Sequence, residues 1–124
     1  MTSREPIDIW TEVAWTTASG KVAAPGIGAV IADTGAMPAG DYNIEISLAC
    51  QDTNAVGKGM VVEHRNAANG ATLQNLGGCA CPDSSNFTRL KYTLLLNERI
   101  RVIAGTAAGA AASSYIACIR TRTT

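Results

Sequence analysis

Strict alternation of apolar and polar residues marks the clearest segment of the chain, "GDYNIEISLACQD", which runs from residue 40 to residue 52. The residues on one side of it are mostly large and apolar: Tyr42, Ile44, Ile46, Leu48 and Cys50. The residues on the other side are polar: Asn43, Glu45 and Ser47. A period of two is typical of a β-strand that buries one face and exposes the other. The segment is therefore predicted to be a half-buried strand.

The same pattern recurs along the rest of the chain. "FTRLKYTLLLN" predicts a strand with four residues facing inward: Leu90, Tyr92, Leu94 and Leu96. After a turn at Asn97 and Glu98, "ERIRVIAG" predicts a strand with Ile100 and Val102 inward and two arginines outward. "SSYIACIRTR" predicts a closing strand, and "GMVVEHRNAANGATLQNL" predicts a hairpin whose tight turn is Asn69-Gly70.

The N-terminal part of the chain is less regular. "IDIWTEVAWT" alternates over part of its length, with Ile7, Ile9 and Val13 on one side. "KVAAPGIGAVIAD" contains Pro25 and two glycines, which favour a bent or edge strand. No segment carries a helical period. Seven or eight short strands without a helix predict an all-β fold, an antiparallel β-sandwich or jelly roll.

The length of 124 residues is that of one domain. Within it we expect an N-terminal arm and edge strands over residues 1–35 and a jelly-roll sandwich over residues 36–124. Charged residues make up only 16% of the chain, below the share of about 25% in ordinary soluble domains. A weakly charged surface suits a protein that buries part of itself against partners.

Charge is distributed unevenly along the sequence, although the formal net charge is zero. Residues 1–57 carry two basic and seven acidic residues, whereas residues 58–124 carry eight basic and three acidic residues. Such halves can complement each other within one sheet or across a subunit interface. No basic run with interleaved aromatic residues is present, so nucleic acid is not expected as a partner.

Neither export nor membrane insertion is expected from the sequence. The opening "MTSREPIDIW" has charges and a proline where a signal peptide has an apolar segment. The uncharged stretch "VIAGTAAGAAASSYIACI" has the length of a membrane span, but its centre is too polar to insert readily. It is interpreted as strand, loop and strand, and the protein is expected to be made in a cytoplasm.

The four cysteines leave three interpretations open. Cys79 and Cys81 are one residue apart in "GGCACPD", a spacing that structural zinc sites rarely use. The alternatives are a disulfide between either residue and another cysteine, and two accessible thiols in a loop before Pro82. Cys50 and Cys118 lie within predicted strands and are interpreted as small buried hydrophobic residues. We expect no metal and no cofactor.

His64 is the only histidine, and it lies between Glu63 and Arg65. As a catalytic base it would need a nucleophile and an orienting acid, and no sequence motif supplies them. A nucleophile-elbow motif, a dinucleotide fingerprint and a phosphate-binding loop are all absent. His64 is therefore predicted to be a surface strand residue, and the protein is expected not to be an enzyme.

Trp10 and Trp15 are the only tryptophans, and both lie near the N-terminus. Tryptophan is over-represented among the residues that dominate the energy of protein interfaces. Each of the two is thus a candidate partner-binding residue, with a place in the core as the alternative.

The order of strands resembles two groups of proteins. "AGDYNIEISL", "GMVVEHRNAANGATL", "YTLLLNERIRVIAG" and "SSYIACIRTR" follow one another as in the jelly-roll heads of the tumour necrosis factor and complement globular-domain type. The same pattern is similar to the small jelly-roll virion proteins of tailed bacteriophages, which include capsid decoration, or cement, proteins and head fibres. The resemblance covers about residues 40–122 and brings no active-site motif. The absence of an export signal favours the phage branch.

This resemblance implies a non-enzymatic structural protein that binds and stabilises an assembled phage head. It implies the major capsid protein as partner, a place on the exterior of the virion and a homo-oligomer, with a trimer favoured. The first 35 residues would then be an arm that reaches a neighbour. The alternative is a trimeric receptor-binding or carbohydrate-binding head domain of a phage fibre.

Overall fold

A computed structural model describes residues 14–51, 57–81, 84–105 and 113–124. Its eight strands are β1 (Thr16–Ala23), β2 (Val30–Asp33), β3 (Gly40–Gln51), β4 (Gly57–Arg65), β5 (Thr72–Cys81), β6 (Ser84–Leu94), β7 (Arg99–Ala104) and β8 (Ser114–Thr123). The described ranges contain no helix, and accordingly none that is long and apolar enough to cross a membrane.

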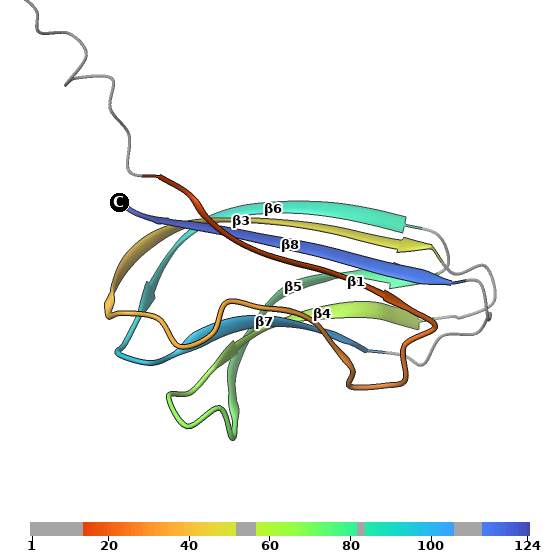
Figure 1. Cartoon of the computed structure of the whole chain (residues 1–124), viewed down its shortest axis with the longest axis horizontal. Coiled ribbons are helices and arrows are strands. Elements are labelled where there is room, and N and C mark those ends of the chain that lie inside the picture. Colours follow the sequence, from red (N-terminus) through yellow and green to blue (C-terminus); the bar gives the residue numbers. More distant parts are fainter. Residues whose placement is uncertain (1–13, 52–56, 82–83, 106–112) are drawn as a thin grey trace, which may run out of the picture.

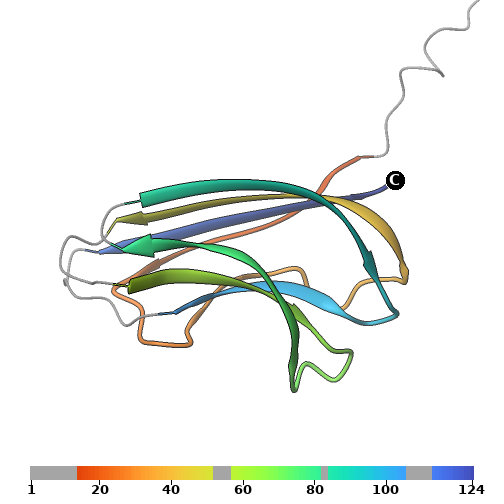
Figure 2. The same ribbon diagram turned by 180° about the vertical axis from the view of Figure 1, so that it is seen from behind.

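The strands form two four-stranded antiparallel sheets that face each other, as Figures 1 and 2 show from opposite sides. Sheet A has the order β1-β8-β3-β6, and sheet B has the order β2-β7-β4-β5. The pairs are nested along the chain: β1 with β8, β2 with β7, β3 with β6 and β4 with β5. A long hairpin of nested pairs rolled into two sheets is a jelly roll, so the predicted fold class is confirmed.

The core lies between the sheets and is supplied by the inward side of each alternating strand. The predicted inward residues of β3 are all buried: Tyr42, Ile44, Ile46, Leu48 and Cys50. They meet buried residues of the facing sheet, which include Met60, Val62, Ile100 and Val102. The period of two in the sequence thus indicated the correct face of β3 and of β7.

The turn between β6 and β7 begins earlier than the sequence pattern predicted. Leu94 is the last buried residue of β6, and Leu96 is 63% exposed rather than inward, which corrects that prediction. The strand stops because the backbone N–H of Leu95 donates to Oε1 of Glu98 at 2.8 Å, which closes the turn. Asn97 adopts a left-handed backbone with φ 67°, a conformation that asparagine tolerates well.

β4 and β5 form the predicted hairpin, but its turn is wider than the predicted tight turn at Asn69-Gly70. Residues 66–71 connect the two strands, and Asn69 has a left-handed backbone at φ 56° whereas Gly70 does not. The segment with Pro25 is divided between β1, a loop and β2, and both strands lie at the edges of their sheets. They approach closely where Gly20 of β1 meets the backbone of Ile31 in β2. A Cβ atom on Gly20 would lie 1.9 Å from the carbonyl oxygen of Ile31. Glycine is required there because only a residue without a side chain permits this approach.

Candidate docking face

The outer face of sheet A carries a row of charged residues from three neighbouring strands. The alternation that buries one side of β3, β6 and β8 turns the other side outward. The register then places Arg89 of β6 beside Glu45 of β3, and Glu45 beside Arg120 of β8. The adjacent row places two basic residues on either side of an asparagine: Lys91, Asn43 and Arg122.

Glu45 holds the first row together. Its Oε1 accepts a hydrogen bond from Nη1 of Arg120 at 3.0 Å, and its Oε2 accepts one from Nε of Arg89 at 3.0 Å. The carboxylate is nearly buried, with 13% of its side chain exposed, whereas Arg89 is 71% and Arg120 is 42% exposed. Because such exposed pairs contribute little to stability, the consequence of this row is orientation of the two guanidinium groups.

Trp15 lies against the same face, immediately before β1. The guanidinium carbons of Arg120 and Arg122 each lie 4.4 Å from the centre of the indole ring. This separation is within the range of cation–π attraction, which is strongest for tryptophan. The indole and the two arginines therefore form one ordered cluster on a solvent-facing sheet, and Trp15 is only partly buried.

Phe87 extends the cluster toward the other edge of the sheet. The residue is 54% exposed, and the centre of its ring lies 5.6 Å from the guanidinium carbon of Arg89. We call this surface the basic face: Trp15, Phe87, Arg89, Lys91, Arg120 and Arg122 around Glu45. Large aromatic and arginine side chains in one patch are typical of the energetic centre of protein interfaces.

The structure places only one of the two predicted partner-binding residues. Trp15 lies on the basic face, outside the core, and its role in binding stays a prediction. Trp10 lies outside the described residues. Arg120 and Arg122 were not singled out from sequence, and no face was predicted for them, whereas the alternation of "FTRLKYT" placed Arg89 and Lys91 on an outward side. The register between strands, which brings them to one row, is not readable from a single segment.

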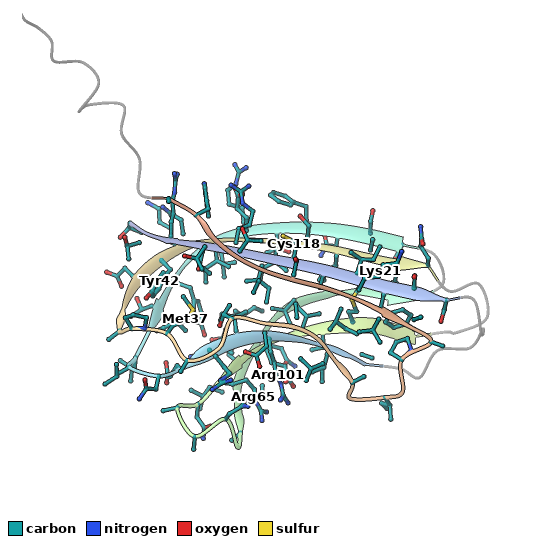
Figure 3. All side chains as sticks on the ribbon, in the orientation of Figure 1. Lys21, Met37, Tyr42, Arg65, Arg101 and Cys118 are labelled. Atoms are coloured by element: carbon teal, nitrogen blue, oxygen red, sulfur yellow. The ribbon has the colours of Figure 1, made fainter. Side chains whose placement is uncertain are left out.

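A second charged cluster lies on the outer side of sheet B, where Figure 3 labels Arg65 and Arg101. Its charged groups form hydrogen bonds with one another and with the adjoining hairpin. Oε1 of Glu63 accepts from Nε of Arg101 at 2.8 Å, and Oε2 accepts from the hydroxyl of Thr72 at 2.9 Å. Arg65 donates to Thr72 and to the backbone oxygen of Asn69, both in the hairpin. These side chains are mostly buried and bind one another, so the cluster fixes the β4–β5 hairpin against its sheet.

His64 lies between the two sheets, and the prediction of a surface residue was wrong. Its exposed fraction is 7%, because it follows Met60 and Val62 on the inward side of β4. Nε2 of His64 donates to Oε1 of Glu98 at 2.9 Å, and Nδ1 pairs with the hydroxyl of Tyr92 at 2.7 Å. The alternation of "MVVEH" contained this signal, but the charged neighbours of the histidine masked it.

A hydroxyl, an imidazole and a carboxylate follow one another in the hydrogen-bonded side chains of Tyr92, His64 and Glu98. This arrangement resembles a hydrolytic triad. The properties of the hydroxyl argue against that use. Burial and the negative charge of Glu98 raise the pKa of Tyr92, which keeps its hydroxyl protonated. A nucleophile that is activated by a lowered pKa would show the opposite shift. The Tyr92 hydroxyl also donates to Oε1 of Gln74 at 3.0 Å, so the chain of hydrogen bonds links both sheets.

Glu98 is the centre of this network. The hydrogen bond from the Leu95 backbone N–H is the largest cause that lowers the pKa of Glu98, and the hydrogen bond with His64 lowers it further. The carboxylate therefore stays ionised at neutral pH although the residue is buried. It connects the β6–β7 turn to β4.

The cysteines differ in part from the prediction. Cys50 is buried, as predicted, and Cys118 is a free thiol on the outer side of β8, between Ser19 and Ser47, rather than buried. Cys79 is buried within β5 and pairs with Met60, so it does not lie in a loop. The adjoining Gly78 fits because a Cβ atom there would meet the Met60 carbonyl oxygen at 2.2 Å. Cys81 ends β5.

Within the described ranges, no group of three or more histidine, cysteine, aspartate and glutamate residues is placed to hold a metal ion. Comparison of the chain with protein-family models, with curated proteins and with solved structures gave no match. The structure therefore combines a jelly-roll sandwich with an ordered, mainly basic and partly aromatic outer face on sheet A.

Proposed function

We propose that the chain is a non-enzymatic structural protein of a virion, a capsid decoration protein that binds the outside of an assembled phage head and stabilises it. The observation that carries the proposal is the basic face of sheet A. Arg89 and Arg120 are held in place by Glu45, and Trp15 lies against Arg120. Side chains that are ordered before binding lose less conformational entropy when they meet a partner.

The partner that this face fits is an acidic protein surface, which we assign to the major capsid protein. The described outer face of sheet A carries five basic residues, Lys21, Arg89, Lys91, Arg120 and Arg122, against two acidic ones, Asp41 and Glu45. The planar guanidinium group of arginine binds a carboxylate through two parallel hydrogen bonds. Two guanidinium groups already lie against the indole of Trp15, which leaves little ring face for a nucleobase.

The mechanism of stabilisation is mass action. A protein that binds the assembled shell and not the separate capsid subunits shifts the equilibrium toward the shell. Such stabilisation requires a rigid scaffold and an ordered contact surface, and it requires no catalytic step. The jelly roll supplies the scaffold, and the raised pKa of Tyr92 agrees with a structural role for the network around His64.

The proposal predicts where the protein is found. Purified particles of the phage that encodes this protein are expected to contain it in a fixed ratio to the major capsid protein, measured by quantitative mass spectrometry. Brief labelling of intact particles with an impermeant amine reagent is expected to modify it, because lysines on an exterior protein are accessible. Absence of the chain from the particles, or labelling only after disruption, would contradict a place on the exterior.

A further inference from the structure

Three aliphatic side chains on the outer side of sheet B break the alternation of inward apolar and outward polar residues. Ile103 follows Arg101 on the outward side of β7, and Val61 precedes Glu63 on the outward side of β4. Val30 begins β2 and is 46% exposed. The outer face of an antiparallel sheet that meets only water normally carries polar residues. β7 and β4 lie in the lower layer in Figure 1, so this side faces away from sheet A.

The register of the strands brings these three residues side by side. Val30 pairs with Ile103, and Ile103 pairs with Val61. Gly78 lies beyond Val61 in the same row and adds no side chain that would cover it. β7 and β4 are the two central strands of sheet B, so the row crosses the middle of the face, where Val61 and Ile103 are partly exposed. We call Val30, Ile103 and Val61 the aliphatic row.

The charged residues beside the aliphatic row are paired with one another. Oε1 of Glu63 lies 2.8 Å from Nε of Arg101 and 3.9 Å from Nη1 of Arg65. Oδ1 of Asp33 lies 3.6 Å from Nη1 of Arg99. These pairs leave little unbalanced charge next to the row. The face thus has an apolar centre bordered by polar groups, which is the composition of a protein interface.

The distribution of charge favours a second copy of this chain as the partner. A two-fold contact places the same surface of each copy against the other, so an unbalanced charge on that surface would meet its like. The described outer face of sheet A, with five basic and two acidic residues, would repel its own copy. The outer face of sheet B, with its aliphatic row and paired charges, meets its own copy without such repulsion.

We propose that two copies pack face to face through the outer sides of their B sheets, with the two aliphatic rows at the centre of the contact. The two-fold axis passes close to Val61 and Ile103, because they lie on the central strands. Sheets packed in this way lie about 10 Å apart, with their side chains between them. The contact does not rest on the proposed function, since the basic face of each copy points away from it.

The test is the mass of the full chain by native mass spectrometry and its dissociation constant by analytical ultracentrifugation. The wild-type protein is expected to be a dimer. Val61→Glu and Val61→Lys each bring two like charges together near the axis and are expected to raise the dissociation constant at least tenfold. Val30→Glu disrupts the same row at an exposed residue. Leu73→Glu, at an exposed leucine of β5 outside the row, is the matched control and is expected to leave the dimer intact.

Mixing Val61→Glu with Val61→Lys tests whether the two aliphatic rows face each other. Unlike charges then meet near the axis, so the equimolar mixture is expected to form a heterodimer more tightly than either variant forms a homodimer. Thermal unfolding confirms that each variant is folded, and if the Val61 variants do not fold, Val30→Glu provides the measurement of dissociation. A monomeric or trimeric wild type, or a dimer that these substitutions do not weaken, would overturn the proposal. Folded Val61 variants that dissociate but form no heterodimer would also overturn it.

Discussion

Substitution of Glu98 by alanine is expected to lower the free energy of unfolding by about 3 to 5 kcal/mol, the range for breaking one side of a buried pair. The carboxylate accepts hydrogen bonds from the Leu95 backbone and from His64, and both donors would be left without it. A buried donor that loses its partner costs more than the hydrogen bond itself contributed. Urea denaturation followed by tryptophan fluorescence measures the change.

Glu98→Gln is the matched control, because the amide oxygen can still accept a hydrogen bond. At neutral pH we expect Glu98→Gln to lose less unfolding free energy than Glu98→Ala. The way this loss depends on pH tests the contribution of the ionised carboxylate. The folded state lowers the pKa of Glu98, so the carboxylate contributes stability above the ordinary carboxyl value of 4.5 and loses it as pH falls through the lowered pKa. The difference between wild type and Glu98→Gln is therefore expected to shrink below pH 4.5.

Two outcomes would show that this network is less important than its geometry indicates. One is an alanine variant as stable as the wild type at neutral pH. The other is a difference between wild type and Glu98→Gln that stays constant as the solution is acidified, since the ionised carboxylate would then make no special contribution.

Gly20→Ala is expected to lower the free energy of unfolding by about 2 to 3 kcal/mol, at the upper end of the cost of overpacking. The added Cβ atom would lie 1.9 Å from the carbonyl oxygen of Ile31, so β1 or β2 must move apart. The obstacle is backbone rather than a flexible side chain, and it therefore has little freedom to yield. Displacement of β1 would also disturb Trp15, which directly precedes it.

Gly26→Ala provides the control for the loss of a glycine as such. Nothing lies within 4 Å of a Cβ atom at Gly26, and its backbone is not left-handed. Its stability is expected to stay within about 0.5 kcal/mol of the wild type, as for ordinary surface substitutions. Equal losses at the two glycines would mean that backbone entropy, and not the close approach of β1 to β2, causes the effect at Gly20.

Alternation along the sequence was enough to identify most of the strands and the inward face of several. In β3 every second residue from Tyr42 to Cys50 is apolar, so burial of that face removes much more apolar surface from water than burial of the other. The hairpin around Asn69 was also recognisable, because asparagine is one of the few residues that tolerate a left-handed backbone, although its turn is wider than predicted. The fold class follows from these local signals, whereas the nested pairing depends on contacts between segments far apart in the chain.

The errors arose where both sides of a strand were plausible. In β8 one side carries Tyr115, Ala117 and Ile119, and the other carries Ile116 and Cys118. The aromatic side is buried, so Cys118 faces outward. His64 was assigned to the surface because the residues next to it are charged. In the alternating pattern of β4, however, it lies on the same side as Met60 and Val62, which face inward. Leu96 continued the pattern of β6, but the hydrogen bond to Glu98 ends the strand first.

The candidate site was predictable only in part, for a related reason. Tryptophan near the N-terminus suggested a partner surface, and the outward sides of two strands were visibly basic. The ladder from Arg89 through Glu45 to Arg120 requires the register of β6, β3 and β8, which no single segment encodes. A pocket that is lined by residues of β1, β8 and the β2–β3 connection likewise appears only in the folded chain.

The measurement that tests the central claim most directly is co-sedimentation with phage heads from which the protein has been stripped. Wild-type protein is expected to bind heads saturably and not to bind free capsid subunits. Arg89→Gln with Arg120→Gln removes two positive charges from the basic face and is expected to weaken binding at least tenfold, or about 1.4 kcal/mol. Leu73→Glu with Leu96→Glu makes the same change in net charge at exposed leucines elsewhere and should bind normally. Equal binding by the arginine double variant and the wild type would contradict docking through the basic face, and no binding of wild type to heads would contradict the proposed function.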